Sequence, residues 1–207
     1  MRIVTVSREF GSGGRELGKR LADRLGWAYY DREVISAIAE KSDLDEAYVA
    51  RLLEQGVKSH YPLTFRRTFS YGAMAQQNTT RILVAQHKVM QELAARNEDC
   101  VIVGRGADVL LKAYNPLNLF VYADLEARMQ RCRERAAAEE QLTDRELERK
   151  IKQVDNGRSK YRQLLTGAPW GRKESYHLCI NTTGQDIKAL SGWIEGYVRY
   201  WFGGDGE

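Results

Sequence analysis

A glycine-rich segment, residues 7–16 (SREFGSGGRE), offers the clearest chemistry in the sequence. It follows a short β-branched run, residues 3–7, and leads into a helical pattern with Leu17, Leu21 and Leu25 on one face. Glycines in such a turn allow successive backbone N–H groups to point into one concavity, and the positive end of the helix dipole then favours an anion. The segment therefore predicts a phosphate cradle; a strand-to-helix turn that binds nothing is the alternative.

This cradle departs from the standard P-loop pattern, GxxxxGK[ST]. If Gly13 is the second glycine, Gly14 stands in place of the lysine and Arg15 in place of the hydroxyl residue; a register one residue later puts Arg15 in place of the lysine. That lysine normally supplies charge to the β- and γ-phosphates, and the hydroxyl group binds Mg²⁺. Arg8 and Arg15 are the candidates to supply the missing charge, and a solvated residue at a helix start is the alternative for each.

Two charged residues, Asp31 and Arg105, follow predicted strands. In sheets of this kind, ligands bind beyond the carboxyl ends of the strands. Asp31 follows residues 27–30 and is placed either to accept a hydrogen bond from a substrate hydroxyl or base, or to cap the next helix. Arg105 follows the buried run 100–103, where a charge has no role in a core, so we expect it to bind phosphate.

Arginines at helical spacing form a further candidate set. Arg128, Arg131 and Arg135 share one helix face, and Asp155 lies three residues before Arg158 on a later predicted helix. Arginines on a lid that closes over phosphates exclude water and neutralise developing charge. Solvated helix faces paired with neighbouring glutamates are the alternative.

An alternation of strands and helices must position these residues. Strands are predicted at residues 3–7, 27–30, 100–103, 117–123 and 178–181. Helices are predicted at residues 16–25, 43–53, 79–95, 124–138, 143–165 and 185–202, and one more follows Asp31. The predicted fold class is α/β, a doubly wound parallel sheet of about five strands with helices on both faces.

The composition is that of an ordinary globular domain. The 207 residues are 43% hydrophobic and 29% charged, with a net charge of +4. These values exclude collagen-like and disordered chains, and the short apolar runs predict a cytoplasmic protein with no membrane segment. The mild charge and the missing motifs argue against nucleic acid as a partner. Three dispersed cysteines and three dispersed histidines show no metal-ligand spacing, so no metal-binding residue is predicted.

Three segments together resemble the cytidylate kinase-like family, a branch of the P-loop nucleoside monophosphate kinases. They are residues 7–16, residues 29–33 (YYDRE) and residues 104–106 (GRG). The resemblance continues through residues 155–161 (DNGRSKY) and 180–182 (INT), and so covers nearly the whole chain. It implies one P-loop domain over residues 1–207, with its core at 1–54 and 98–207. An insert of residues 55–97 and a lid-like region of residues 131–165 complete the implied domain.

Bacterial cytidylate kinases carry a loop of the form GPAGSGKGT, which shares only Gly11, Ser12 and Gly13 with this chain. The aspartate of their LDSG segment corresponds to Asp31, whereas their DGRD motif lies over residues 103–106 and loses both aspartates. Their DxxR pair, which belongs to the nucleotide site, lies over residues 155–158. The resemblance therefore keeps the basic lining but changes the lysine and acidic groups that handle Mg²⁺ and the γ-phosphate.

The function expected from these features is transfer of the ATP γ-phosphoryl group, with Mg²⁺, to a nucleoside monophosphate or a related small anionic acceptor. CMP or dCMP is suggested by the resemblance alone. A nucleotide- or phosphate-binding protein without turnover, acting as a sensor or partner module, is the alternative, favoured by the missing lysine and aspartates. Catalytic roles are predicted for Arg15, Arg105, Arg131 and Arg158. Donor contacts are predicted for Arg8, Gly11, Ser12, Gly13, Gly14, Arg15 and Arg128, and acceptor contacts for Asp31, Arg66, Arg105, Asp155 and Arg158.

Aromatic residues are concentrated in the last predicted helix. They are Trp193, Tyr197, Tyr200, Trp201 and Phe202. The pattern leaves two interpretations open, burial in the core or burial in the interface of a homodimer.

Overall fold

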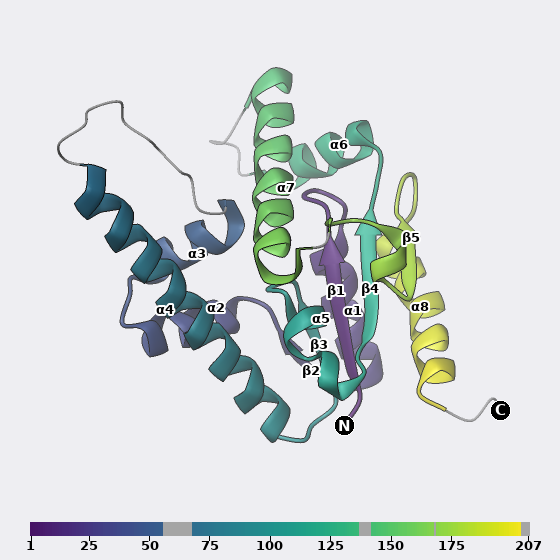
Figure 1. Cartoon of the computed structure of the whole chain (residues 1–207). Coiled ribbons are helices and arrows are strands. Elements are labelled where there is room, and N and C mark those ends of the chain that lie inside the picture. Colours follow the sequence, from purple (N-terminus) through teal and green to yellow (C-terminus); the bar gives the residue numbers. More distant parts are fainter. Residues whose placement is uncertain (56–67, 137–141, 168, 204–207) are drawn as a thin grey trace.

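Five parallel strands form one sheet at the centre of the computed structural model, which describes residues 1–55, 68–136, 142–167 and 169–203 (Figure 1). The strands are β1 (Ile3–Arg8), β2 (Ala28–Tyr30), β3 (Cys100–Val103), β4 (Leu117–Tyr122) and β5 (Leu178–Asn181). Their order in the sheet is β2-β3-β1-β4-β5. All five predicted strands are confirmed, and β1 extends one residue further because Arg8 still pairs with Val121 of β4.

Helices connect these strands and cover both faces of the sheet. The described helices are α1 (Gly14–Leu25), α2 (Arg32–Ser42), α3 (Glu46–Gln55), α4 (Thr68–Ala95), α5 (Ala107–Leu110), α6 (Leu125–Arg135), α7 (Asp144–Thr166) and α8 (Ile187–Trp201). Two short 3₁₀ turns, η1 (Lys112–Tyr114) and η2 (Lys173–Ser175), lie before β4 and β5. The α/β doubly wound prediction is confirmed.

Two helical features differ from the sequence prediction. Helix α4 begins at Thr68 rather than at residue 79. The prediction began too late because the residues before 79 show no helical spacing of apolar side chains. Helix α5 and the turn η1 were not predicted, since elements of four and three residues are too short to show periodicity. The predicted division into core, insert and lid stays a prediction.

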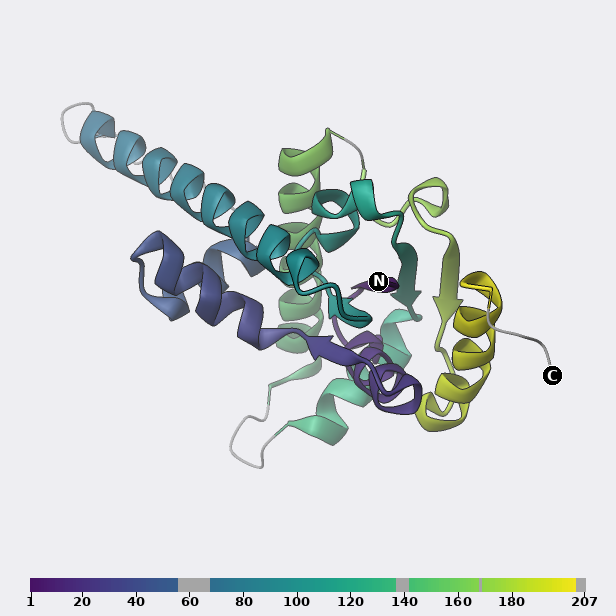
Figure 2. The same cartoon turned by 90° about the horizontal axis from the view of Figure 1, so that it is seen from below.

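Alternation along β3 divides the core between the two faces of the sheet. Val101 and Val103 pack in one cluster with residues of α1 and α8, whereas Cys100 and Ile102 pack in the other with residues of α2 and α4. Figure 2 shows α2 and α4 on one side of the molecule and α8 on the other. Both faces of the sheet are thereby buried, as expected for an all-parallel sheet.

The N-terminus of α7 carries a specific cap. Thr143 accepts a hydrogen bond from the Glu146 N–H, and the Glu146 side chain accepts one from the Thr143 N–H. This capping box fixes where α7 starts. No helix in the described ranges is long and apolar enough to span a membrane.

Helix α1 lies close to the sheet because Gly18 has no side chain. A Cβ at this position would lie 2.7 Å from Val103 Cγ2 and 3.6 Å from Val6 Cγ2. Gly196 in α8 is the opposite case, since a Cβ there would meet no atom within 4 Å.

We predict opposite effects of alanine at these two helical glycines. Gly18→Ala gains about 1 kcal/mol of helix propensity but forces overpacking that costs about 1–3 kcal/mol, so its free energy of unfolding falls. Gly196→Ala, the matched control, keeps the propensity gain and becomes more stable when unfolding is measured on dilute, monomeric protein. Urea unfolding followed by circular dichroism measures both, and a Gly18→Ala variant as stable as Gly196→Ala would contradict the close packing of α1.

Candidate active site

The glycine loop connects β1 to α1 through two residues in the left-handed region of backbone space. Gly11 has φ +79° and Gly13 has φ +81°. A Cβ on Gly11 would lie 2.8 Å from the Arg128 carbonyl oxygen, and one on Gly13 would lie 2.8 Å from Ile187 Cδ1. The shape of the loop therefore depends on glycine at both positions.

Side chains from behind the loop bind its carbonyl oxygens. Arg128 Nε donates to the Phe10 oxygen at 2.8 Å, and Arg131 Nη1 donates to the Gly11 oxygen at 3.0 Å. Two further donors complete the set: Arg158 Nη1 to the Arg8 oxygen at 2.9 Å, and Thr182 Oγ1 to the Ser12 oxygen at 2.7 Å. The carbonyl groups of the loop are thus held by the protein itself.

The N-terminus of α1 carries no such partner. Gly13 is its N-cap residue, and no side-chain hydrogen bond caps the first turn within the described parts of the chain. The first N–H groups of a helix have no acceptor within the helix, and they concentrate the positive end of its dipole. An anion at this position would receive both the N–H groups and the field.

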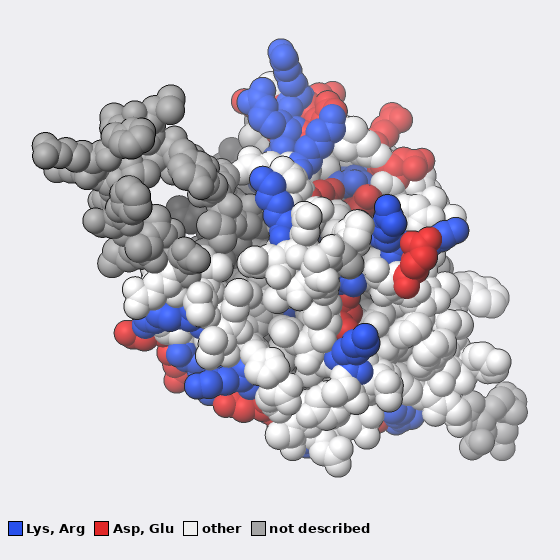
Figure 3. All heavy atoms as spheres, in the orientation of Figure 1, with Lys and Arg blue, Asp and Glu red and all other residues white. Residues whose placement is uncertain are grey.

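These residues line a cleft of about 970 Å³. Its described walls come from the loop, α2, α3, α6 and α7, and carry eight cationic and two acidic side chains. The cations are Arg8, Arg15, Arg32, Arg131, Arg133, Arg135, Lys150 and Arg158; the acids are Glu9 and Glu46. Figure 3 shows Lys and Arg gathered over the upper part of α7. Such a lining attracts an anionic ligand.

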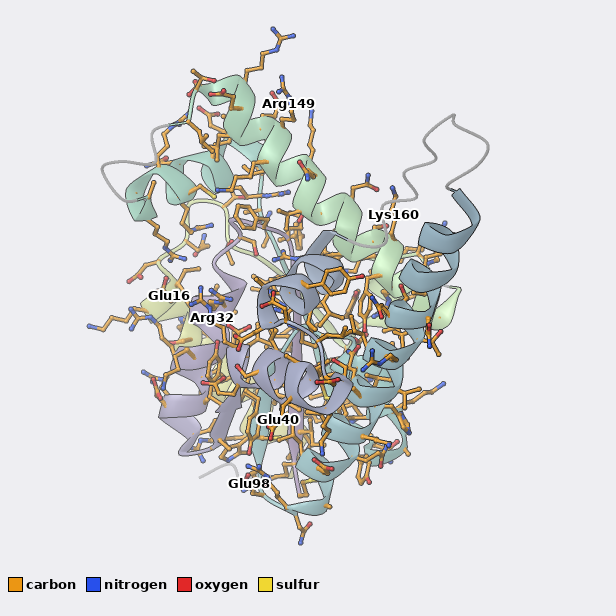
Figure 4. The ribbon with its side chains drawn as sticks, turned by 90° about the vertical axis from the view of Figure 1, so that its left-hand side faces the viewer. Glu16, Arg32, Glu40, Glu98, Arg149 and Lys160 are labelled. Atoms are coloured by element: carbon orange, nitrogen blue, oxygen red, sulfur yellow. The ribbon has the colours of Figure 1, made fainter. Side chains whose placement is uncertain are left out.

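One side of the cleft mouth is held by an ion pair between helices. Glu16 in the first turn of α1 pairs with Arg20 at 2.8 Å and with Arg135 at the end of α6. Figure 4 shows Glu16 close to Arg32 at the start of α2, with α6 and α7 beyond them. The contact with Arg135 ties the end of α6 to the helix that carries the loop.

Three arginines, Arg8, Arg105 and Arg158, converge around a small cavity beside the cleft, and Arg8 and Arg158 also line the cleft itself. The Arg8 guanidinium lies against Gly104, where any Cβ would overlap Arg8 Nη1. Burial lowers the pKa of Arg8 well below its usual value, and the charges of Arg158 and Arg105 lower it further. Asp31 opposes this shift, with Oδ1 3.8 Å from Arg8 Nη2. Cations crowded to this extent are stabilised by an anion that enters between them.

Arg105 stands in a backbone conformation that glycine normally adopts. Its φ is +57°, between Gly104 at +76° and Gly106 at +61°. The side-chain amide of Gln86, which is fully buried in α4, donates to the Arg105 carbonyl oxygen, and the Tyr161 hydroxyl donates to Gln86 Oε1. This network links α4 and α7 to the backbone of Arg105. Sequence reasoning missed Gln86, although it interrupts an otherwise apolar stripe in α4.

Asp31 is the N-cap residue of α2 by position, but its side chain makes no capping hydrogen bond. Its Oδ2 pairs with Arg15 Nε at 2.6 Å, while the Arg15 side chain is about half exposed in the cleft. The other oxygen, Oδ1, is buried and accepts no hydrogen bond within the described part of the chain. Asp31 therefore keeps one buried carboxylate oxygen without a hydrogen-bond donor at the carboxyl end of β2, and such an oxygen calls for a partner.

Arg128 and Asp155 lie behind the loop rather than in the open cleft. Asp155 Oδ1 accepts from the Phe10 N–H at 2.8 Å, and its Oδ2 pairs with Arg128. Arg128 also pairs with Glu9 at 2.9 Å. The geometry gives both residues a supporting place, and their predicted contacts with nucleotide stay predictions. Arg66, predicted to bind the acceptor, lies outside the described residues.

A magnesium ion finds no ready side-chain ligand beside the loop. The carboxylates there, Glu9, Glu16, Asp31 and Asp155, each pair with at least one arginine. The buried Ser12 hydroxyl donates to the Glu9 carbonyl oxygen at 2.9 Å. The described residues therefore fit a polyphosphate but do not supply a direct site for its metal, and no catalytic step is assigned through Mg²⁺.

Replacing Arg105 by glycine distinguishes the backbone strain at this position from the effect of the arginine charge. A buried left-handed arginine costs about 1–3 kcal/mol, so Arg105→Gly relieves strain and removes a charge from the Arg8 cluster. We predict an unchanged or higher melting temperature together with a weaker affinity for inorganic tripolyphosphate. Differential scanning fluorimetry with and without tripolyphosphate measures both. A large fall in melting temperature would show that the arginine side chain is structural.

Known proteins resemble this chain in family and in fold. The model of the cytidylate kinase-like family matches residues 3–184. A search of curated proteins finds no significant match. An uncharacterized protein from Eubacterium ventriosum has a similar structure, with a TM-score of 0.69 at 22% sequence identity, over 96% of this chain and 98% of that one.

Two shikimate kinases share the fold more distantly. The enzyme from Bacteroides thetaiotaomicron gives a TM-score of 0.56 at 15% identity, covering 96% of this chain and 98% of that one. The enzyme from Acinetobacter baumannii, solved in complex with shikimate, gives 0.52 at 18% identity, covering 97% of this chain and 94% of that one. These structures share the fold of this chain. The match over residues 3–184 shows that the chain belongs to the cytidylate kinase-like family.

Proposed function

We propose that the protein is a phosphotransferase that moves the γ-phosphoryl group of ATP to a small acceptor. The observation that carries this proposal is the uncapped N-terminus of α1, which opens into a cleft whose described lining holds eight cationic and two acidic side chains. Membership of a kinase-like family supports the reaction class. Phosphoryl transfer needs positioning and charge stabilisation more than a reactive side chain, and this cleft offers both.

The donor is assigned to the glycine loop. The β- and γ-phosphates would bind the N–H groups around Gly13 and Gly14, with Arg15 close by in the same cleft. Arg15 is the candidate for the missing lysine because it is half exposed and borders the N-terminus of α1. Its pair with Asp31 would have to loosen when the triphosphate enters.

The acceptor is assigned to the part of the cleft beside the small cavity around which Arg8, Arg105 and Arg158 converge. That cavity, of about 50 Å³, is also bordered by Trp170. Asp31 Oδ1 would accept a hydrogen bond from the acceptor, since this oxygen receives no hydrogen bond within the described part of the chain, and its ion pair with Arg8 spans 3.8 Å. The family points to a nucleoside monophosphate, with CMP or dCMP first, and the shikimate-bound fold relative extends the test to small hydroxy acids.

In the reaction, the chain would align donor and acceptor and stabilise charge on the transferring group. ATP supplies the phosphoryl group, and the acceptor oxygen forms the new P–O bond while the bond to ADP breaks. Arg8 and Arg158 would lie beside this point in fixed positions, because Arg8 packs against Gly104 and Arg158 donates to the Arg8 carbonyl oxygen. Preorganised charge of this kind lowers the barrier without reorganisation at the moment of transfer.

A nucleotide-binding protein without turnover is the second candidate. One observation favours it: the carboxylates beside the loop are engaged by arginines, so none is ready to bind the metal of MgATP. Such a protein would bind ATP and form no product.

The test is a product assay with MgATP and a panel of CMP, dCMP, UMP, AMP, GMP and shikimate, with chromatographic separation of products. We expect turnover of one acceptor and a fall in kcat/KM of about 10²-fold or more in Arg15→Met, the usual effect of removing a charge that stabilises the transition state. Lys19→Met is the matched control, since Lys19 lies on the same helix and pairs with Asp23.

Three results would decide between the candidates. Turnover lost in Arg15→Met but kept in Lys19→Met supports the phosphotransferase. Binding of ATP in calorimetry with no product from any acceptor supports the binding protein. Equal turnover in both variants would exclude Arg15 as the replacement for the lysine.

A further inference from the structure

Helix α8 exposes large aromatic side chains on its outer face. Trp193 is 81% exposed, Tyr200 78% and Trp201 41%, whereas Ile194 and Val198 on the opposite face are buried against the sheet and α1. The sequence left two interpretations for these aromatics, and for Trp193 and Tyr200 the structure excludes burial in the core. Figure 1 shows α8 at the edge of the molecule, with its outer side uncovered by any other labelled element.

The exposed face has the spacing of a helix-pairing seam. Ala189, Trp193, Gly196 and Tyr200 follow one another at intervals of four, three and four residues. This is the spacing of the a and d positions through which two helices pack. No member of the stripe is charged, and the edge of the molecule over α8 is mostly white in Figure 3.

Two charged residues beside this stripe, Glu195 and Arg199, are already paired within the chain. Glu195 binds Arg24 at 2.6 Å and Arg199 at 2.9 Å, and these contacts hold the pKa of Glu195 below its usual value. A partner on this face therefore need not supply charge, and it must cover aromatic surface. A second copy of the same face meets that requirement.

We propose that α8 pairs with α8 of a second copy in an antiparallel dimer around a twofold axis. In such an isologous contact, residue i meets residue j and residue j meets residue i. An axis between Gly196 and Tyr197 sets Trp193 of each copy opposite Tyr200 of the other. The stripe is thus complementary to itself, with aromatic pairs on both sides of small residues near the axis.

The exposed area is of the size that a dimer contact needs. Aromatic side chains present about 150–250 Å² each, so the exposed fractions of Trp193, Tyr200 and Trp201 amount to ~400 Å² per copy. A stable interface buries about 800 Å² per partner. The three aromatics therefore supply about half of it, and neighbouring residues such as Ala189 and Tyr197 lie where they would add to the rest. A patch of this size is comparable to the largest apolar patch on a folded protein, which is often functional.

The experiment is analytical ultracentrifugation of the full chain over a wide range of concentration. We expect the wild type to dimerise and Trp193→Glu and Tyr200→Glu each to weaken the dimer by about 30-fold or more, as removal of a central aromatic anchor does. Val84→Glu is the matched control, because Val84 is an exposed apolar residue of α4, 50% exposed, that the proposed contact does not include. Circular dichroism confirms that each variant is folded.

Each outcome bears on the proposal. Dimers of the wild type and of Val84→Glu, with monomers of both aromatic variants, support it. A wild type that stays monomeric at the highest concentration overturns it. Co-sedimentation of that monomer with phosphatidylcholine vesicles would then assign the aromatic face to a lipid surface instead. Dimers that persist in both aromatic variants also overturn it, since the contact would then lie elsewhere.

Discussion

The glycine loop keeps its shape because side chains behind it occupy its carbonyl oxygens. Arg128, Arg131, Arg158 and Thr182 each donate to one of them, and Asp155 accepts from the Phe10 N–H. A loop held in this way presents the uncapped start of α1 to the cleft without rearranging first. Preorganisation of this kind reduces the free-energy cost of binding a phosphate chain.

The arginines around the loop explain how a site without the usual lysine could still bind a triphosphate. Charge in this site is distributed over several arginines rather than concentrated in one side chain: Arg8 is buried at the end of β1, and Arg15 borders the cleft. Arginine in such positions offers several donors in a fixed plane, which suits phosphate oxygens. The balance between turnover and binding alone then depends on whether Arg15 can leave Asp31 when nucleotide binds.

Much of the fold follows from the sequence, because alternating buried runs and amphipathic segments have few packing solutions. The strands, the parallel sheet and the place of the glycine loop are of this kind. Arg128 and Asp155 show where sequence reasoning stops. Spacing places Arg128 on one helix face with Arg131, and Asp155 on a face of another helix with Arg158. It does not say which neighbour either face meets. Gln86 could have been found from the sequence, because it is a polar residue on the same helix face as the apolar Ile82 and Val89. The left-handed conformation of Arg105 could not be predicted, because a turn of this length shows no hydrophobic periodicity.

The most direct test of the central claim is calorimetric titration of ATP and of inorganic tripolyphosphate into the wild type and Gly13→Ala. Gly13 adopts φ +81° and has no room for a Cβ beside Ile187. Strain of about 1–3 kcal/mol at this position, if it falls on the bound shape of the loop, would weaken binding by about 5- to 150-fold. The account predicts that the wild type binds both ligands at one site and that the folded variant loses this affinity. Absence of binding to the wild type, or equal binding to Gly13→Ala, would contradict the assignment of the glycine loop as the phosphate cradle.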